Sequence, residues 1–315
     1  MFRPALRLAL TLGLLLLTVA SGPFVTNAVA APVCPTDQDS FAAAISAAGA
    51  GGTVTFSCDA TITLSSTITL TNVTIDGNGH QVTISGNKAV VIFVASENVT
   101  LDSLTVVDGF DNGAGPAVGG GAVRVTAGST LSILDSTFTG NSATWGLGGA
   151  ILNQGTVTIT NSTFTGNTAS AGGVIANYGD TVEVPPTVTI TNSTFNNNLA
   201  NSGGVVYTSN GVATFISSTF DNNSGSGYAG VVRSVGSSLT IINSTLSNNY
   251  SDFSGAIGAQ VNSTLSIANS TFTGNWSGRG PANITSTENT TVRLVNTILS
   301  GNASQNSMCL MGSGA

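Results

Sequence analysis

Charge is scarce in this sequence, and positive charge is scarcest. Only 7% of the 315 residues are charged, with seven lysines and arginines against 14 aspartates and glutamates. A protein that binds nucleic acid or an anionic membrane surface needs clustered Lys and Arg side chains. The composition therefore argues against nucleic acid and anionic lipid as partners.

Long apolar runs are missing except at the start of the chain. Two arginines precede the apolar stretch 8–20, and Ala28-Val29-Ala30 forms an A-x-A cleavage motif. These are the parts of a secretory signal peptide, which we predict at residues 1–30. The apolar run is shorter than the roughly 20 residues that a membrane span needs. The sequence thus predicts an exported protein, extracellular or at the cell surface, with no transmembrane helix after signal removal.

Cysteine and histidine are too few for a metal site built from them. The cysteines are Cys34, Cys58 and Cys309, no C-x-x-C spacing occurs, and the one histidine is His80. In an exported protein, a disulfide between Cys34 and Cys58 could close the N-terminal end. Cys309 would then be free or paired outside the chain. We interpret His80 as a turn residue rather than a general base, because no nucleophile or acid motif stands near it.

What the chain has in place of these features is repetition. The string TVTITNSTFTGNT, residues 156–168, returns about every 26 residues. The last apolar residue of the strand pattern marks each copy: Phe138, Phe164, Phe195, Phe220, Leu246, Phe272 and Leu299. Self-similarity at a fixed period, over more than half of the chain, indicates a repeat architecture.

Within each copy, apolar and polar residues alternate. Val157 and Ile159 are apolar and their neighbours are threonines, which is the pattern of a strand with one buried face. About ten residues after most markers, a glycine precedes two apolar residues, as in Gly149-Ala150-Ile151. Short strands at this period, without helical periodicity or hairpin turns, predict an all-β fold. We expect a single-stranded right-handed parallel β-helix of about ten coils.

Asparagine recurs at two positions of the repeat. One asparagine follows each marker by three residues, and Asn, Asp or Ser precedes each marker by three residues. We interpret these side chains as satisfying the turns and as stacking in ladders between coils. The residues that follow the markers are Asn141, Asn167, Asn198, Asn223, Asn249, Asn275 and Asn302.

The chain before the regular repeats is predicted to cap and start the same stack. We assign residues 31–98 to an N-terminal cap and the first coils, and residues 99–315 to the repeated coils of one continuous domain. Small and apolar residues within 36–48 predict a short helix with a start signal at Asp39 or Ser40. Such a helix would cover the strand edges of the first coil, which otherwise invite aggregation.

Two stretches resemble known families. GGTVTF at 51–56, followed by residues 62–86, resembles the opening coils of pectate-lyase-like right-handed parallel β-helices. The F-x-x-N motif of Phe138 to Asn141, followed by Gly-Gly-Ala-Ile at 148–151, resembles the repeats of chlamydial-type polymorphic outer membrane proteins. This second resemblance covers roughly residues 99–302 and implies an adhesin-type β-helix, secreted or displayed at the cell surface, which in that family is the outer membrane.

The pectate-lyase-like resemblance also implies an alternative function as a polysaccharide lyase or hydrolase. A lyase of that kind needs a basic residue beside Ca²⁺ held by several carboxylates, and hydrolysis needs paired carboxylates. Asp108, Asp111 and Arg124, in and after the largest interruption of the repeat, are the candidates for such a site. No paired-acid constellation is visible, so we predict no catalytic residues and no cofactor, and leave Ca²⁺ in this loop as the alternative.

A binding function is the main prediction. In the repeat register, Arg124, Tyr207 and Arg233 share one outward column, with the two arginines four coils apart. We take these residues as a candidate binding face. We predict a non-enzymatic, adhesin-like protein that binds glycans or cell surfaces, with the ligand and the mode of attachment left open.

Threonine forms columns of its own at the coil spacing. One column holds Thr137, Thr163 and Thr194, and continues with Thr219, Thr245 and Thr271; another holds Thr158, Thr189, Thr214 and Thr240. Flat threonine arrays can order water, which makes ice binding a hypothesis. The alternative, which we prefer from sequence alone, is that threonine serves as a strand former on a solvated face.

Overall fold

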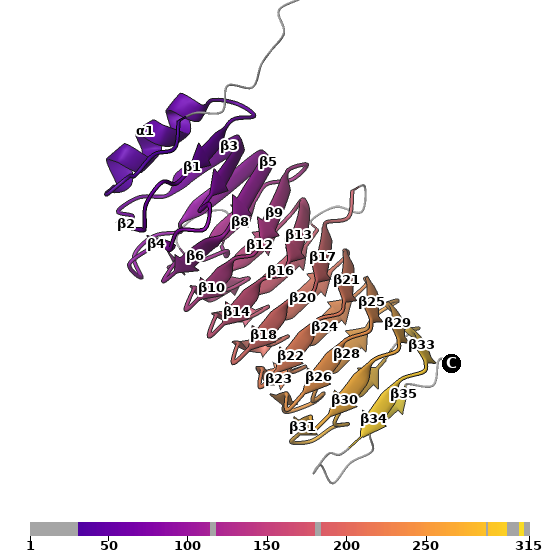
Figure 1. The fold of residues 1–315 in the computed structure, drawn as a ribbon. Coiled ribbons are helices and arrows are strands. Elements are labelled where there is room, and N and C mark those ends of the chain that lie inside the picture. Colours follow the sequence, from indigo (N-terminus) through magenta and orange to yellow (C-terminus); the bar gives the residue numbers. More distant parts are fainter. Residues whose placement is uncertain (1–30, 114–117, 180–183, 288, 301–308, 312–315) are drawn as a thin grey trace, which may run out of the picture.

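The computed structural model describes residues 31–113, 118–179, 184–287, 289–300 and 309–311. It is a parallel β-solenoid with one short helix, α1 (Gln38–Ala48), at its N-terminal end (Figure 1). All pairings between its strands are parallel, and each strand pairs with its counterpart in the next coil. The predicted all-β fold with a capping helix is confirmed. The predicted signal peptide, residues 1–30, lies outside the described residues.

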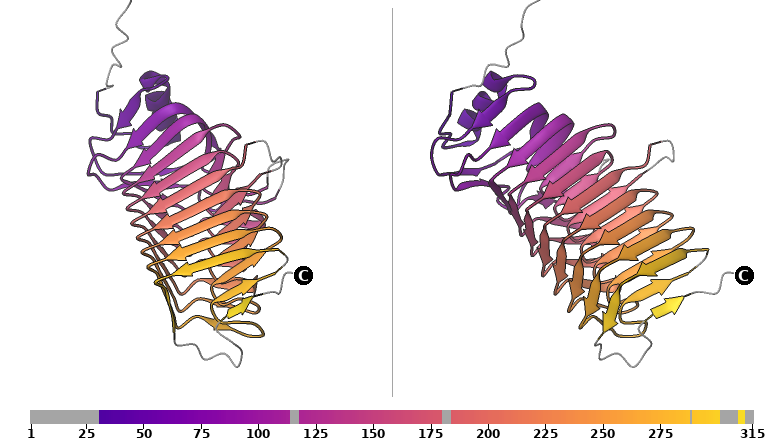
Figure 2. Two further views of the ribbon diagram at one scale, coloured as in Figure 1. Left: turned by 90° about the vertical axis from the view of Figure 1, so that its right-hand side faces the viewer. Right: turned by 45° about the vertical axis from the view of Figure 1, so that its right-hand side comes forward.

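One coil shows how the repeat folds. The chain runs through β12 (Ile151–Asn153), β13 (Thr156–Thr160), β14 (Thr163–Thr165) and β15 (Thr168–Ala171) before β16 (Ile175–Tyr178) begins the next coil. Strands β12 and β13 lie in one long sheet, β14 in a second and β15 in a third. Figure 2 shows the strands of successive coils stacked in these columns.

The described strands fall into three parallel sheets. The 18-stranded sheet contains β12, β13, β16, β1 (Thr53–Thr55), β3 (Ile68–Asp76), β5 (Phe93–Asp102), β8 (Val123–Val125), β9 (Thr130–Leu134), β17 (Thr187–Thr191), β20 (Val206–Ser209), β21 (Val212–Ile216), β24 (Val232–Val235), β25 (Ser238–Ile242), β28 (Ile257–Gln260), β29 (Thr264–Ala268), β32 (Ile284–Ser286), β33 (Thr291–Val295) and β35 (Cys309–Met311). The 10-stranded sheet contains β14, β2 (Ala60–Thr63), β4 (Val82–Ser85), β6 (Leu104–Val107), β10 (Thr137–Thr139), β18 (Thr194–Asn196), β22 (Thr219–Asp221), β26 (Thr245–Ser247), β30 (Thr271–Thr273) and β34 (Ile298–Ser300). The 7-stranded sheet contains β15, β7 (Phe110–Asp111), β11 (Ser142–Leu147), β19 (Leu199–Ser202), β23 (Ser224–Tyr228), β27 (Tyr250–Ser251) and β31 (Trp276–Ser277).

The core contains a stack of phenylalanine rings, contributed by four successive coils. Phe138, Phe164, Phe195 and Phe220 are fully buried, and neighbouring rings stack with centroids 4.9, 5.0 and 5.0 Å apart. Offset aromatic pairs at this distance stabilise a core by about 0.5–1.5 kcal/mol each beyond the apolar area that they bury. The repeat markers of the sequence are therefore the inward-facing residues of the 10-stranded sheet.

A ladder of buried asparagines runs beside the phenylalanine stack. The Nδ2 of Asn167 donates to Asn198 Oδ1 at 3.0 Å and to the carbonyl of Phe138 at 3.1 Å. Its Oδ1 accepts from Nδ2 and from the backbone N–H of Asn141, at 3.1 and 3.0 Å. The same bonds continue through Asn223, Asn249 and Asn275. Because both the oxygen and the nitrogen of each amide have hydrogen-bond partners, these polar side chains can be buried without the cost of an unsatisfied polar group.

The asparagine before each marker has a different role. Asn161, Asn192, Asn243 and Asn269 have φ angles of 51, 49, 53 and 51°, in the left-handed region. Asn tolerates this conformation better than most residues, because its short polar side chain can bond locally. The serine that follows, such as Ser162, is buried and donates to the carbonyl two residues earlier. The two residues together turn the chain from the 18-stranded to the 10-stranded sheet.

The N-terminal end is covered by α1. Its N-cap is Asp37, whose Oδ1 accepts from the N–H of Ser40 at 2.8 Å while Ser40 Oγ accepts from the N–H of Asp37. The start predicted at Asp39 or Ser40 is therefore two or three residues too late. The reciprocal bonds of this capping box satisfy free N–H groups of the first turn. Phe41 packs against Phe56 of the first coil, and a disulfide joins Cys34 to Cys58.

No helix in the described part of the chain is long and apolar enough to cross a membrane. The single helix there, α1, has 11 residues. The side chain of Cys309, at the start of β35, lies outside the described residues.

Candidate functional site

Most of the exposed aromatic residues gather near the C-terminal end of the 7-stranded sheet, and Trp145 of β11, 79% exposed, lies apart from them. Trp276 of β31 is 44% exposed, Phe253 is 39% exposed and Tyr228 of β23 is 38% exposed. Tyr250 of β27 lies among them, half-buried. Aromatic residues make up only 6% of the sequence, so four of them on three neighbouring coils is a concentration that the core does not require.

Strand register brings these rings together in two pairs. Tyr250 pairs directly with Trp276 between β27 and β31, and their ring centroids are 4.6 Å apart. Tyr228 ends β23, and Phe253 follows β27, with its N–H bonded to the carbonyl of Gly227 at 3.2 Å. The rings of Tyr228 and Phe253 are 5.0 Å apart and nearly parallel, at 17°.

Two arginines lie over the second pair of rings. The guanidinium of Arg233 is 4.4 Å from the centre of the Tyr228 ring, and that of Arg279 is 5.8 Å from the centre of the Phe253 ring. Arg233 is held in place because its Nη1 donates to Ser202 Oγ at 2.9 Å and its Nη2 to Gln260 Oε1 at 3.2 Å. Cation–π contacts of this kind add to the order of a surface cluster.

A carboxylate completes the cluster. The hydroxyl of Tyr250 donates to Asp252 Oδ1 at 2.7 Å, and the backbone N–H of Arg279 donates to the Asp252 carbonyl at 2.7 Å. The hydrogen bond to Asp252 raises the pKa of Tyr250, with burial as a smaller cause. The phenol therefore stays protonated and holds the carboxylate beside the rings. We call Tyr228, Arg233, Tyr250, Asp252, Phe253, Trp276 and Arg279 the aromatic–arginine patch.

The patch has the composition of a binding surface. Tyr, Trp and Arg are the residues that most often carry binding energy in interfaces, because they bury a large area with few rotatable bonds and offer polar groups. Sugar rings present apolar C–H faces together with hydroxyl groups. The aromatic rings can contact the C–H faces, while Asp252 and the arginines can bond the hydroxyls.

Of the three residues in the binding face predicted from the repeat register, the structure brings only two together. Tyr207 of β20 pairs directly with Arg233 of β24, so these two side chains are neighbours. Arg124 of β8 is separated from Tyr207 by Leu152 and Ala176 in the same column. Its Nε donates to the Gly119 carbonyl at 2.9 Å. Arg233 therefore joins the aromatic–arginine patch, and Arg124 does not.

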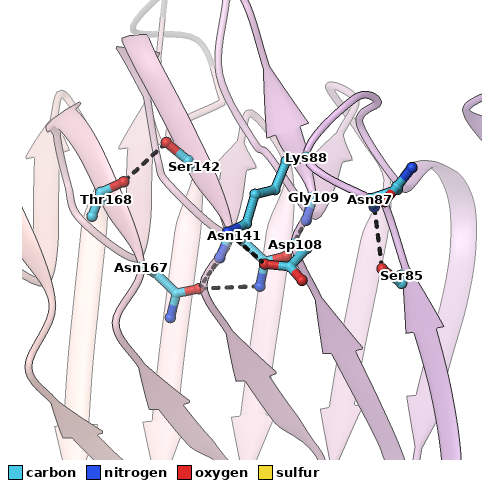
Figure 3. Close-up of polar contacts among 9 residues, drawn as sticks. All are labelled: Ser85, Asn87, Lys88, Asp108, Gly109, Asn141, Ser142, Asn167 and Thr168. Atoms are coloured by element: carbon cyan, nitrogen blue, oxygen red, sulfur yellow. Dashed lines mark hydrogen bonds and ion pairs between the residues drawn. The ribbon is translucent and has the colours of Figure 1, made fainter.

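The residues of the alternative catalytic site are divided between two contacts. Arg124 Nη2 is 3.2 Å from Asp111 Oδ1, and Asp111 is buried and also accepts from the N–H groups of Gly113 and Gly119. Asp108 contacts Lys88 Nζ at 3.9 Å, beside the Asn141–Asn167 step of the asparagine ladder (Figure 3). Asp111 and Arg124 thus hold the loop to β8, and the pair has the contacts of a structural ion pair.

No group of three or more His, Cys, Asp or Glu residues is placed to hold a metal ion among the residues that the structure describes. The sequence hypothesis of Ca²⁺ near Asp108 and Asp111 gains no support from this geometry. His80 Nδ1 is 3.5 Å from Asp59 Oδ1. The backbone N–H of His80 donates to the Gly77 carbonyl at 2.9 Å, as expected for a residue of a tight turn.

Comparison with known proteins gives remote structural likeness alone. No family model matches the chain, and no curated protein matches it. Two solved structures of PfbA, a surface adhesin of Streptococcus pneumoniae, are similar over most of their length. One is 15% identical, with 88% of this chain and 89% of that chain covered and a TM-score of 0.47. The other is 10% identical, with 91% and 98% covered and a TM-score of 0.42. A likeness this distant does not bear on function.

Most of the patch was not predicted from sequence. Of its residues, only Arg233 belonged to the candidate face. Tyr228 and Phe253 lie where the coils differ in length, and the pairing of β19 with β23 shifts register between Ala200 and Ser202. The sequence did contain a signal for this patch. Aromatic and basic residues are rare in the chain, and several of them fall between residues 228 and 279.

Proposed function

We propose that this protein is an exported or surface-displayed, adhesin-like binding protein, and that the aromatic–arginine patch binds glycans. One observation supports it most: two stacked aromatic pairs, two arginines and a carboxylate meet on the surface of a chain in which only 7% of the residues are charged and 6% are aromatic. Burial of rings in the core has a structural reason. Exposure of rings beside ordered polar groups is typical of recognition.

The arrangement favours contact with a neutral or weakly charged sugar chain. Asp252 offsets one of the two arginines, so the patch keeps a single net positive charge. Within the patch, Trp276 is the most exposed aromatic residue, at 44%, and β31 is the last strand of the 7-stranded sheet. We infer that a sugar ring packs on Trp276 and that its hydroxyls bond to neighbouring polar groups of the patch.

A glycan array with the mature protein tests this proposal. Trp276→Ala should weaken binding to the best glycan by about 2 kcal/mol, or roughly thirtyfold in Kd, as expected when a central aromatic contact is removed. Trp145→Ala is the matched control, because Trp145 is a tryptophan of the same sheet, 79% exposed and outside the patch. Equal effects of the two substitutions, or no glycan bound by the wild-type protein, would contradict the proposal.

The enzymatic alternative is tested in parallel. Incubation of the mature protein with polygalacturonate and Ca²⁺ should give no unsaturated product, because Asp111 and Arg124 are engaged with each other and with backbone groups. Product formation that Arg124→Ala abolishes would replace the binding proposal with a lyase.

A further inference from the structure

The 10-stranded sheet presents an unbroken column of threonines to solvent. The strand pairings place nine threonines in direct register on the outward side of this sheet, one from each of its first nine strands, and the last strand, β34, has Ile298 at this position. The nine threonines are Thr61, Thr83, Thr105, Thr137, Thr163, Thr194, Thr219, Thr245 and Thr271. The glycan proposal makes no use of this face, because the aromatic–arginine patch lies on the 7-stranded sheet, its neighbouring loops and β24 of the 18-stranded sheet.

A second outward column lies two residues further along the same strands. It holds four threonines, Thr63, Thr139, Thr165 and Thr273, and the other levels hold Ser85, Val107, Asn196, Asp221, Ser247 and Ser300. Asp221 is the one ionisable residue in the two columns, and neither contains an aromatic residue. We call the two columns together the threonine array.

The array is regular in both directions. Between the two columns lie the buried Phe138, Phe164, Phe195 and Phe220, whose rings repeat at 4.9, 5.0 and 5.0 Å with angles of 14, 5 and 11° between neighbouring planes. Such small angles show that successive coils are related almost by pure translation. Along each strand, the two outward positions are about 6.6–6.8 Å apart. The surface groups therefore form a nearly flat, two-dimensional lattice.

The hydroxyl groups of the first column are available to solvent. Within the described residues, none of these nine threonine hydroxyls forms a hydrogen bond with another protein group. The contrast with the turns is clear, because Ser162, Ser193 and Ser244 each bond to a backbone carbonyl. Strand formation explains why threonine is tolerated at these positions. It does not by itself account for nine in succession, since valine and isoleucine form strands equally well.

We propose that the threonine array binds ice. Each of the nine threonines in the first column presents a hydroxyl and a methyl group, and these groups recur at the coil spacing of about 4.8 Å. Such a row can fix water molecules at a regular spacing, as an ice face requires. Ordering water on a protein normally costs entropy. Water at an ice face is already ordered, so a matching lattice gains many weak contacts at once. A dissolved small ligand needs a concave site with convergent polar groups, and this face offers neither.

The proposal is tested by ice recrystallisation inhibition and by ice-plane affinity of the labelled mature protein. The wild-type protein should slow recrystallisation and become incorporated into a growing ice crystal. Thr163→Tyr with Thr194→Tyr places two bulky rings at adjacent points of the array and should abolish both effects. Thr158→Tyr with Thr189→Tyr is the matched control, because these threonines are also outward and directly paired, but on the 18-stranded sheet.

Each result decides the matter. Circular dichroism and thermal unfolding establish that both double variants keep the fold, which tyrosine favours as a good strand former. If a variant misfolds, Thr163→Val with Thr194→Val, which removes hydroxyls and keeps the shape of the side chains, replaces it. A wild-type protein without activity toward ice, or equal loss in both double variants, overturns the proposal. Retention of the wild-type protein on crystalline cellulose without any effect on ice also overturns it, and assigns the array to a polysaccharide surface.

Discussion

Removal of one amide from the asparagine ladder should cost far more stability than removal of an amide from the surface of the strand just before it, β18. Asn198 is 1% exposed. Its Nδ2 donates to Asn223 Oδ1 and to the Phe164 carbonyl, at 2.9 and 3.0 Å. Its Oδ1 accepts from the backbone N–H and from Nδ2 of Asn167, both at 3.0 Å. Asn198→Ala therefore deletes four buried hydrogen bonds.

The expected loss follows from these four bonds. A buried hydrogen bond contributes about 1 kcal/mol net, and an orphaned buried donor costs about 1–3 kcal/mol. The backbone N–H of Asn167 loses its acceptor, so we expect Asn198→Ala to lower the free energy of unfolding by about 4 kcal/mol. That is a large part of the roughly 5–15 kcal/mol that typical domains have.

The control is Asn196→Ala, two residues earlier on β18. Asn196 faces outward, and its side chain bonds to Thr165 Oγ1 at 2.7 Å and to Asn197 at 3.5 Å. A surface change of this kind should cost about 0.5 kcal/mol or less. Urea unfolding followed by circular dichroism, with the disulfide intact, gives both values. Equal losses in the two variants would refute the assignment of the ladder as a main source of stability.

Three further predictions concern other parts of the fold. Phe195→Ala, which empties the space between two stacked rings, should lower the free energy of unfolding by about 3–5 kcal/mol, measured by urea unfolding with Thr194→Ala as the outward-facing control. Hydrogen bonds from the N–H and hydroxyl of Ser40 lower the pKa of Asp37. The cap should therefore stabilise α1 above the ordinary Asp pKa of about 4 and be lost as pH falls through the lower folded-state value. Hydrogen exchange of α1 against pH checks this, and Asp37→Ala should remove the dependence. The pKa of Tyr250 is raised, so its bond to Asp252 should hold below the ordinary Tyr pKa of about 10 and be lost as pH rises through the higher folded-state value. Ultraviolet titration should show Tyr250 ionising at lower pH in Asp252→Asn, and an unchanged titration would argue against the contact.

The repeat made the interior predictable. In a stack of coils related by translation, a residue that recurs at the period must occupy one column, so Phe164 and Phe195 could be placed on each other before any coordinates. The same reasoning placed the asparagines in ladders. It could not tell that the asparagine after the marker points inward while the one before it adopts a left-handed turn, because both positions carry the same residue type.

The aromatic–arginine patch lies where periodic reasoning fails. Tyr228 and Phe253 belong to connections that differ between coils, and their stacking depends on local loop geometry. The Asp111–Arg124 contact likewise crosses the largest interruption of the repeat. The helix start was misplaced for a related reason, since Asp37 and Asp39 both offer a carboxylate and only the backbone bond to Ser40 distinguishes them.

Stacking in register has a consequence for how such a molecule can change over generations. Each coil touches only the coils above and below it, so the duplication of one coil's length of gene would insert a new layer whose phenylalanine, asparagine and threonine meet their like on both sides. Unequal recombination between copies could therefore lengthen or shorten the protein in whole layers without a new folding problem. The size of any surface that it presents would then be set by copy number, one layer at a time.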